Sequence, residues 1–168
     1  DVTVKVEWST LNYKDGLALT GKAPVVRRFP MIAGIDFAGT VEQSSNPAWK
    51  VGDKVVCNGW GMGETHLGAY AEKARVKGDW LVKLPDGLSA RDGAAAMLQG
   101  MTAHYLVHST YQLKAGETAL ISAAAGGVGL LFCQMAKMVG ARVIGTAGTP
   151  EKAALAKASC ASMSAGRS

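Results

Sequence analysis

The chain has 168 residues, of which 48% are hydrophobic and 18% are charged, and its three cysteines are too few for a disulfide scaffold. This composition excludes an intrinsically disordered chain and allows one or two small domains. The few cysteines indicate a reducing compartment, so we expect a cytoplasmic protein. The net charge of +5 comes from scattered basic residues without interleaved aromatics, so we expect no nucleic-acid partner.

Short strand patterns dominate residues 1–90. In "VTVKVEW", Val2, Val4 and Val6 alternate with Thr3, Lys5 and Glu7, which predicts a strand with one buried face. Further strands are expected in "DFAGTVEQ", "GDKVVCN", "GAYAEKARV" and "WLVKL", whereas "NGWGMGETHLG" is too rich in glycine for a strand or helix. Short, closely spaced strands are typical of a compact barrel.

The pattern of expected secondary structure changes after a turn at Pro85-Asp86-Gly87. Ser89 is the expected N-cap, and 94–108 has helical composition, interrupted by Gly100. From there helix and strand alternate, as in an α/β parallel sheet. We therefore expect two domains, a β-rich one over 1–90 and an α/β one over 91–168.

A glycine turn lies at the centre of the second half. "TALIS" is an expected buried strand, "RVIGT" an expected second strand, and Gly140 ends the helix between them. On that helix we expect a buried face, made of Val128, Leu131, Met135 and Met138. The stretch 118–136 carries no charge, but the glycines in its middle argue against a membrane helix.

The turn has the form AxxGxxG rather than GxGxxG, with Ala123, Gly126 and Gly129 at the spaced positions. Between a strand and a helix, such a turn brings backbone N–H groups and the positive end of the helix dipole to a pyrophosphate. The expected cofactor contacts in the turn are Ala125, Gly126, Gly127, Val128 and Gly129. The alternative is a tight turn without a ligand.

The end of the second strand indicates which dinucleotide binds. NAD-binding units place Asp or Glu there, whereas "GTAGTPEK" has no acid before Glu151. Ala147 and Gly148 leave room for a 2′-phosphate, to which Thr149 offers a hydroxyl and Lys152 a charge, so we expect NADPH. The alternative role of Thr149 is an N-cap with Pro150 after it, and both roles can hold together.

These motifs resemble the zinc-free branch of the medium-chain dehydrogenase/reductase superfamily. "STLNYKDGLALTGK", "FPMIAGIDFAGTV" and "GWGMGETHLGAYAEKARVKGDWLV" resemble the acryloyl-CoA reductase subgroup. "LQGMTAHYLVHSTYQLKAGE" and "AAAGGVGLLFCQMAKMVGARVIGTAGTPEK" resemble zeta-crystallin-like NADPH:quinone oxidoreductases. The resemblance implies a GroES-like barrel, then an incomplete Rossmann domain. It also implies a homodimeric, NADPH-dependent reductase of enoyl-CoA thioesters, enones or quinones.

The same resemblance implies that the chain is a fragment. It begins without an initiator Met, and "ASCASMSAGRS" lacks the strand and glycine pattern that relatives have after Lys157. The remaining sheet strands of both domains would then be missing, and the fragment itself could be inactive.

The resemblance also assigns site residues. Tyr13 would contact the nicotinamide end of the cofactor, and Thr102 would pack beside the nicotinamide. Asn12 is a candidate donor to a substrate carbonyl, and Asp15 a candidate to orient Tyr13 or Lys14. The alternative for each is a structural hydrogen bond or a helix kink. Arg27 and Arg28 are candidates for CoA phosphates, with a solvated surface as the alternative.

We expect no metal. "LNYKDG" has no Cys, and Ile35 in "GIDFAG" stands where zinc-containing relatives carry His. Cys57, Glu64 and His66 do not have the spacing of a zinc site, and His104 and His108 have no evident third ligand. Two non-enzymatic alternatives remain: an NADPH-binding protein of the crystallin or RNA-binding kind, or an inactive fragment.

Overall fold

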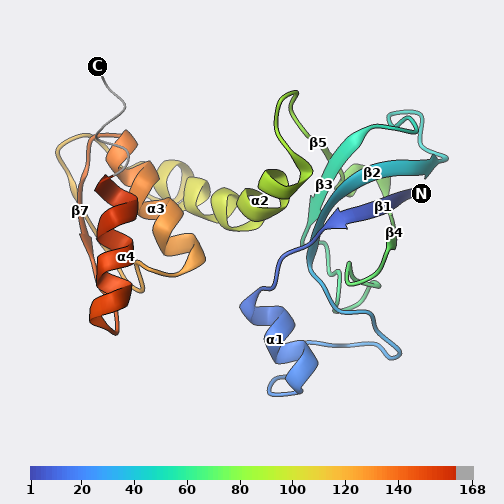
Figure 1. Cartoon of the computed structure of the whole chain (residues 1–168), viewed down its shortest axis with the longest axis horizontal. Helices are drawn as coiled ribbons and strands as arrows, with labels where there is room; N and C mark the ends of the chain where they lie inside the picture. Colours follow the sequence, from blue (N-terminus) through green and yellow to red (C-terminus); the bar gives the residue numbers. More distant parts are fainter. Residues whose placement is uncertain (162–168) are drawn as a thin grey trace. The chain divides into compact units, whose positions relative to one another are not determined.

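The computed structural model describes residues 1–161, shown in Figure 1. The chain divides into two compact units, Asp1–Leu98 and the residues from Gln99 onward. The division falls inside helix α2 (Ala90–Tyr105), whereas the change in sequence texture suggests a boundary at 90/91. None of the helices within 1–161 has the length and hydropathy needed to cross a membrane.

The first unit is built on a five-stranded antiparallel sheet in the order β4-β1-β2-β3-β5. Its strands are β1 (Val2–Trp8), β2 (Asp36–Ser44), β3 (Lys54–Asn58), β4 (Lys73–Val76) and β5 (Val82–Lys83). All five expected strands are present. The fourth is shorter than expected because it begins only at Lys73, and the fifth is shorter because Trp80 belongs to a 3-10 turn, η1 (Gly78–Trp80).

The alternation predicted for β1 is confirmed. Val2 and Val4 are fully buried, and Val6 packs against the same core cluster, which includes Phe37 and Met62. Strands β1 and β2 approach closely at Gly39, where a Cβ would lie 2.1 Å from the carbonyl oxygen of Lys5. A glycine is therefore required at this point of the sheet.

Helix α1 (Tyr13–Thr20) was not predicted. It has eight residues, its one buried side chain is that of Asp15, and it ends at Gly21 with φ of 65°. An apolar stripe, the usual signal of a helix, is therefore absent from it. The N-terminus of α1 is stabilised by hydrogen bonds between polar side chains, some of which belong to residues distant in the sequence.

The second unit contains a parallel strand pair, β6 (Thr118–Ile121) and β7 (Arg142–Gly145). Its helices are α3 (Gly127–Met138) and α4 (Pro150–Ala161), together with the end of α2 and a π-helical turn, η2 (Leu106–Thr110). The expected order of strand, glycine turn, helix and strand is confirmed. Gly140 ends α3 with φ of 86°, and the bonds Gly140 N–H to Lys137 O and Ala141 N–H to Ala136 O form a Schellman motif.

Two expectations about burial are wrong. The buried residues of α3 are small (Gly129, Cys133 and Ala136), whereas Met138 is 58% exposed, because the helix packs closely on the strands and α4 through small side chains. Strand β6 is not buried on both faces. Leu120 is 69% exposed, because α3 and α4 cover the opposite face of the strand pair within the described residues.

Candidate functional site

A polar network surrounds the N-terminus of α1 in the first unit. Asn12 is the N-cap and forms a capping box with Asp15, whose Oδ2 accepts the backbone N–H of Asn12 at 3.0 Å. The other carboxylate oxygen of Asp15 accepts the N–H of Gly34 at 3.2 Å. Asp15 is 1% exposed, so this buried carboxylate ties α1 to the segment that leads into β2.

Asp36, at the start of β2, is a second buried carboxylate with 2% exposure. Its oxygens accept the backbone N–H of Thr10 at 2.8 Å, the Thr10 hydroxyl, the Ser9 hydroxyl at 3.3 Å and the amide of Asn12 at 2.8 Å. Buried carboxylates need such donors to offset their lost hydration. Asp36 therefore fixes the path of the chain from β1 into α1.

The side-chain amide of Asn12 is already engaged. Its nitrogen lies 2.8 Å from Asp36 Oδ2, 3.1 Å from Thr10 Oγ1 and 3.2 Å from Asp15 Oδ2. An amide has two hydrogens to donate, so a substrate carbonyl would have to compete with these acceptors. In this arrangement Asn12 holds the two carboxylates and the helix start together.

Tyr13 and Lys14 extend outward from this network. Tyr13 is the first residue of α1 and is 85% exposed, while Lys14 Nζ pairs with Glu64 at 2.7 Å. The Tyr70 hydroxyl donates to the carbonyl of Thr10 at 3.0 Å. Desolvation and the charge of Asp15 raise the pKa of Tyr70, so the phenol is neutral throughout the physiological range.

Sequence reasoning missed Asp36. The available signal was a carboxylate between apolar neighbours in "GIDFAG", at the start of a strand whose first four residues are buried. The partners of Asp36 lie 24 to 27 positions earlier in the chain, so their contact could not be inferred from local spacing.

The glycine turn in the second unit brings α3 close to the end of β6. A Cβ on Gly129 would lie 2.4 Å from the carbonyl oxygen of Ala123 and 2.8 Å from Cα of Ala124. Ala123 itself has φ of 51°, and its carbonyl accepts the N–H of Gly126, the N-cap of α3. The glycine at the third spaced position, Gly129, is therefore needed for close packing of helix on strand.

A pocket of about 420 Å³ opens at this turn. Its lining includes Gly126, Gly127, Val128 and Gly129, four of the five predicted contacts in the turn, with Leu106, Leu120 and Phe132 as apolar neighbours. Ala125 packs instead against the core cluster of α3, and Thr102 is an exposed residue of α2 that does not line the pocket. The first N–H groups of a helix have no acceptor within it, so the pocket suits an anion.

The segment after β7 has open space and a capped helix. A Cβ on Gly148 would meet nothing within 4 Å, and Lys152 is exposed. The Thr149 hydroxyl oxygen accepts the N–H of Lys152 at 3.3 Å, and a hydrogen bond from Thr149 lowers the pKa of Glu151. The N-cap role of Thr149 is confirmed.

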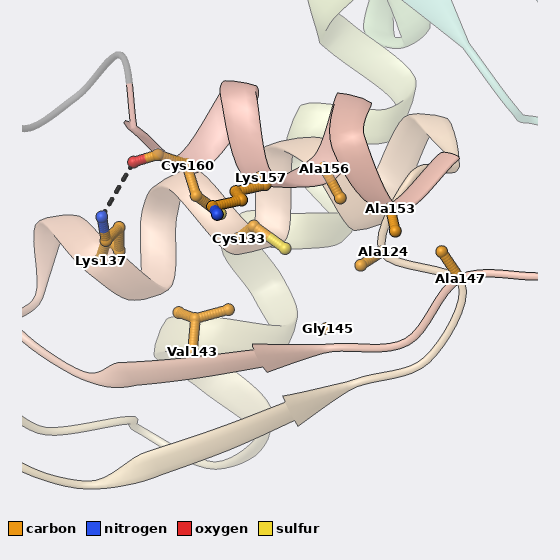
Figure 2. Close-up of a pocket in the computed structure, with 10 residues that line it drawn as sticks. All are labelled: Ala124, Cys133, Lys137, Val143, Gly145, Ala147, Ala153, Ala156, Lys157 and Cys160. Carbon is orange, nitrogen blue, oxygen red and sulfur yellow. Dashed lines mark hydrogen bonds between the residues drawn. The ribbon is translucent and has the colours of Figure 1, made fainter. Parts of the chain in front are cut away.

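Small side chains from α3, β7 and α4 converge around a second pocket of about 410 Å³ (Figure 2). Ala147 lines it together with Ala153 and Ala156, and Lys137 Nζ donates to the carbonyl of Cys160 at 2.9 Å. Burial, followed by the neighbouring Cys160, raises the pKa of the Cys133 thiol to about 11. This thiol is therefore protonated and weakly nucleophilic at neutral pH.

No group of three His, Cys, Asp or Glu side chains within 1–161 is arranged to hold a metal. The three residues singled out by sequence have other roles. Cys57 is 1% exposed, Glu64 pairs with Lys14, and His66 lies edge-on to Trp80 with ring centroids 4.8 Å apart. His104 and His108 contact each other, with centroids 4.5 Å apart.

Comparison with known proteins gives consistent similarities. The alcohol dehydrogenase GroES-like domain matches residues 1–86. The chain is 47% identical over 152 residues to the probable acrylyl-CoA reductase AcuI of Escherichia coli, covering 88% of this chain and 47% of that protein. It is 43% identical over 159 residues to a Pseudomonas aeruginosa quinone oxidoreductase, covering 94% and 47%.

Among solved structures, Escherichia coli YhdH with bound NADPH superposes with a TM-score of 0.89 at 44% identity, covering 95% of this chain and 50% of that one. The chain therefore spans about half the length of the relatives that it matches.

Proposed function

Because the chain belongs to the medium-chain dehydrogenase/reductase superfamily, with a GroES-like domain followed by the start of a nucleotide-binding α/β region, we propose that it forms part of a reductase. This reductase is zinc-independent, uses NADPH and reduces conjugated acceptors. The observation that carries this proposal is the pocket at the glycine turn, where the N-terminus of α3 meets the end of β6. We propose a domain boundary at 90/91 and a cytoplasmic homodimer for the complete protein.

The cofactor residues proposed are those of the second unit. The N–H groups of the turn from Ala125 to Gly129 would receive the pyrophosphate, and Thr102 would lie beside the nicotinamide. Ala147 and Gly148 leave space for the 2′-phosphate, while Thr149 and the charge of Lys152 bind it. The bound cofactor supplies the hydride.

The acceptor residues proposed are those at the start of α1. Tyr13 is the exposed aromatic side chain that contacts cofactor and substrate, and Asn12 and Asp15 hold it in place through the buried network. A conjugated thioester ranks first as substrate, because the motifs around α1 resemble acryloyl-CoA reductases and the chain is 47% identical to the probable acrylyl-CoA reductase AcuI. Quinones rank second, because the chain is also 43% identical to a quinone oxidoreductase. The first unit decides the order, since discrimination between substrates depends on residues around the reacting molecule.

The test is NADPH oxidation by the protein expressed from its complete gene, with acryloyl-CoA and a small 1,4-quinone compared by kcat/KM. We expect turnover of both, faster with the thioester. Preference for the quinone by tenfold or more would reverse the order of substrates.

A non-catalytic NADPH-binding role is the second candidate. It is favoured by one observation, that the amide of Asn12 is engaged by Asp36 and Asp15 rather than available to a substrate carbonyl. NADPH binding without turnover of either acceptor would support this role and overturn the reductase.

A further inference from the structure

A pocket of about 420 Å³ in the first unit lies outside both proposed sites. It combines three cations, Arg28, Arg75 and Lys77, with the rings of His66 and Trp80. Its volume falls in the range of roughly 300–1,000 Å³ that small-molecule sites occupy. The mixture of positive charge and aromatic surface indicates a ligand that carries both negative charge and an aromatic ring.

Two of the three cations are uncompensated. Arg75 donates from Nε and Nη2 to the Asp1 carboxylate at 3.0 and 2.8 Å, so these two groups neutralise each other. Arg28 and Lys77 form no ion pair within the described part of the chain, and Lys77 Nζ lies 5.8 Å from the centre of the Trp80 ring. Two free positive charges at one pocket favour an anion with more than one negative charge.

The aromatic side is held in place by its neighbours. The Trp60 and Trp80 rings lie 5.8 Å apart and nearly parallel, with 4° between their planes, and His66 contacts Trp80 edge-on. The turn that carries Trp80 is fixed because the Trp49 indole donates to the carbonyl of Gly78 at 2.9 Å. Such a surface suits a planar heterocycle.

One loop connects this pocket to the start of α1. Glu64 pairs with Lys14, the neighbour of Tyr13, and its carbonyl accepts the N–H of Arg27, the residue before Arg28. His66, two positions further along, lines the pocket. The loop that carries Glu64 and His66 therefore runs from the start of α1 to the pocket. A ligand could lie along this loop, with its reacting end near Tyr13 and its anionic, aromatic end at Arg28.

We propose that this pocket binds the 3′,5′-bisphosphorylated adenosine of an acyl-CoA substrate. This rests on the proposed function, since the CoA thioester is its first-ranked substrate. Arg28 and Lys77 contact the phosphates and the Trp80 side contacts the adenine. The residue pair Arg28 and Lys77 then determines preference for CoA thioesters over small acceptors.

The binding test uses adenosine 3′,5′-bisphosphate as the probe, with calorimetry and tryptophan emission as readouts. One molecule binds per chain, and Arg28→Ala weakens it by about tenfold or more, the effect of losing one charge-assisted contact. Lys73→Ala is the matched control, because Lys73 is an exposed lysine of β4 paired with Glu42, and it leaves binding unchanged.

NADPH carries a similar phosphorylated adenosine, so its site must be separated from this one. Saturating NADPH leaves probe binding intact if the pocket is distinct. Loss of probe binding in Lys152→Ala but not in Arg28→Ala would assign the probe to the glycine turn and overturn the proposal.

The kinetic test compares acryloyl-CoA with acryloyl-N-acetylcysteamine, which has the same reacting group without the nucleotide. Arg28→Ala raises KM about tenfold for the CoA ester and leaves the truncated ester unchanged. Equal effects on both esters, or none on either, would overturn the pocket while leaving the reductase intact. Probe binding that depends on Arg28 without turnover of any acceptor would instead retain the pocket and refute the reductase.

Discussion

The side-chain amide nitrogen of Asn12 lies 2.8 Å from Oδ2 of Asp36, which joins the start of α1 to the start of β2. The same nitrogen lies 3.2 Å from Oδ2 of Asp15, so one amide bridges two buried carboxylates. Removing any member leaves charged or polar atoms with fewer partners in a poorly hydrated site. The geometry of the proposed acceptor site therefore depends on this bridge.

Asp36→Asn tests the bridge. The change replaces one accepting oxygen by a donor that faces the donors of Asn12 and Thr10, so we expect a loss of about 1–3 kcal/mol in the free energy of unfolding. Urea denaturation measures it. Glu42→Gln on the same strand is the control, because its exposed pair with Lys73 contributes less than about 1 kcal/mol. Equal stability of the two variants would show that the network is dispensable.

Gly129→Ala tests the packing of the glycine turn. The added Cβ would lie 2.4 Å from the Ala123 carbonyl, so α3 must move, and both stability and NADPH affinity should fall. Gly100→Ala in α2 is the matched control, since its Cβ would meet only Leu131 at 3.8 Å, and it should gain about 0.5–1 kcal/mol. Thermal unfolding and cofactor titration compare them. Unchanged affinity in Gly129→Ala would contradict the role of the turn.

Lys152→Ala tests the selection of NADPH. If Lys152 contacts the 2′-phosphate, the preference for NADPH over NADH should fall by about tenfold to a hundredfold, with NADH affinity unchanged. Lys157→Ala on the same helix is the control. A parallel loss for both cofactors would indicate a structural effect on α4 rather than a phosphate contact.

Thiol labelling tests the burial of the cysteines. Burial, with the charge of Asp36 second, raises the pKa of Cys57 to about 12, and the pKa of Cys133 is raised to about 11. Both thiols are protonated below these values, so alkylation should be slow at pH 7 and faster only in alkaline solution. Mass spectrometry should find Cys160 alkylated first, since it is only partly buried. Rapid labelling of native Cys57 at pH 7 would contradict the core assignment.

The sequence predicts features whose signal is local. Alternation at Val2 and Val4 predicts β1, and the glycine spacing predicts the turn before α3, because each depends on a few neighbouring residues. Helix α1 lacks this signal, since its start depends on the long-range contact between Asn12 and Asp36. The buried face of α3 was wrong at Met138, because close packing selects small residues rather than the most apolar ones.

Deuteride transfer tests most directly the central claim that NADPH reduces a conjugated thioester. NADPH deuterated at the transferable position of C4 is incubated with acryloyl-CoA and the protein expressed from its complete gene, and the thioester product is analysed by mass spectrometry. Conjugate reduction predicts propionyl-CoA with one deuterium at the β-carbon, a solvent proton at the α-carbon and one NADP⁺ per product. Unreduced acryloyl-CoA in the presence of bound NADPH, or deuterium at any other carbon, would contradict the account.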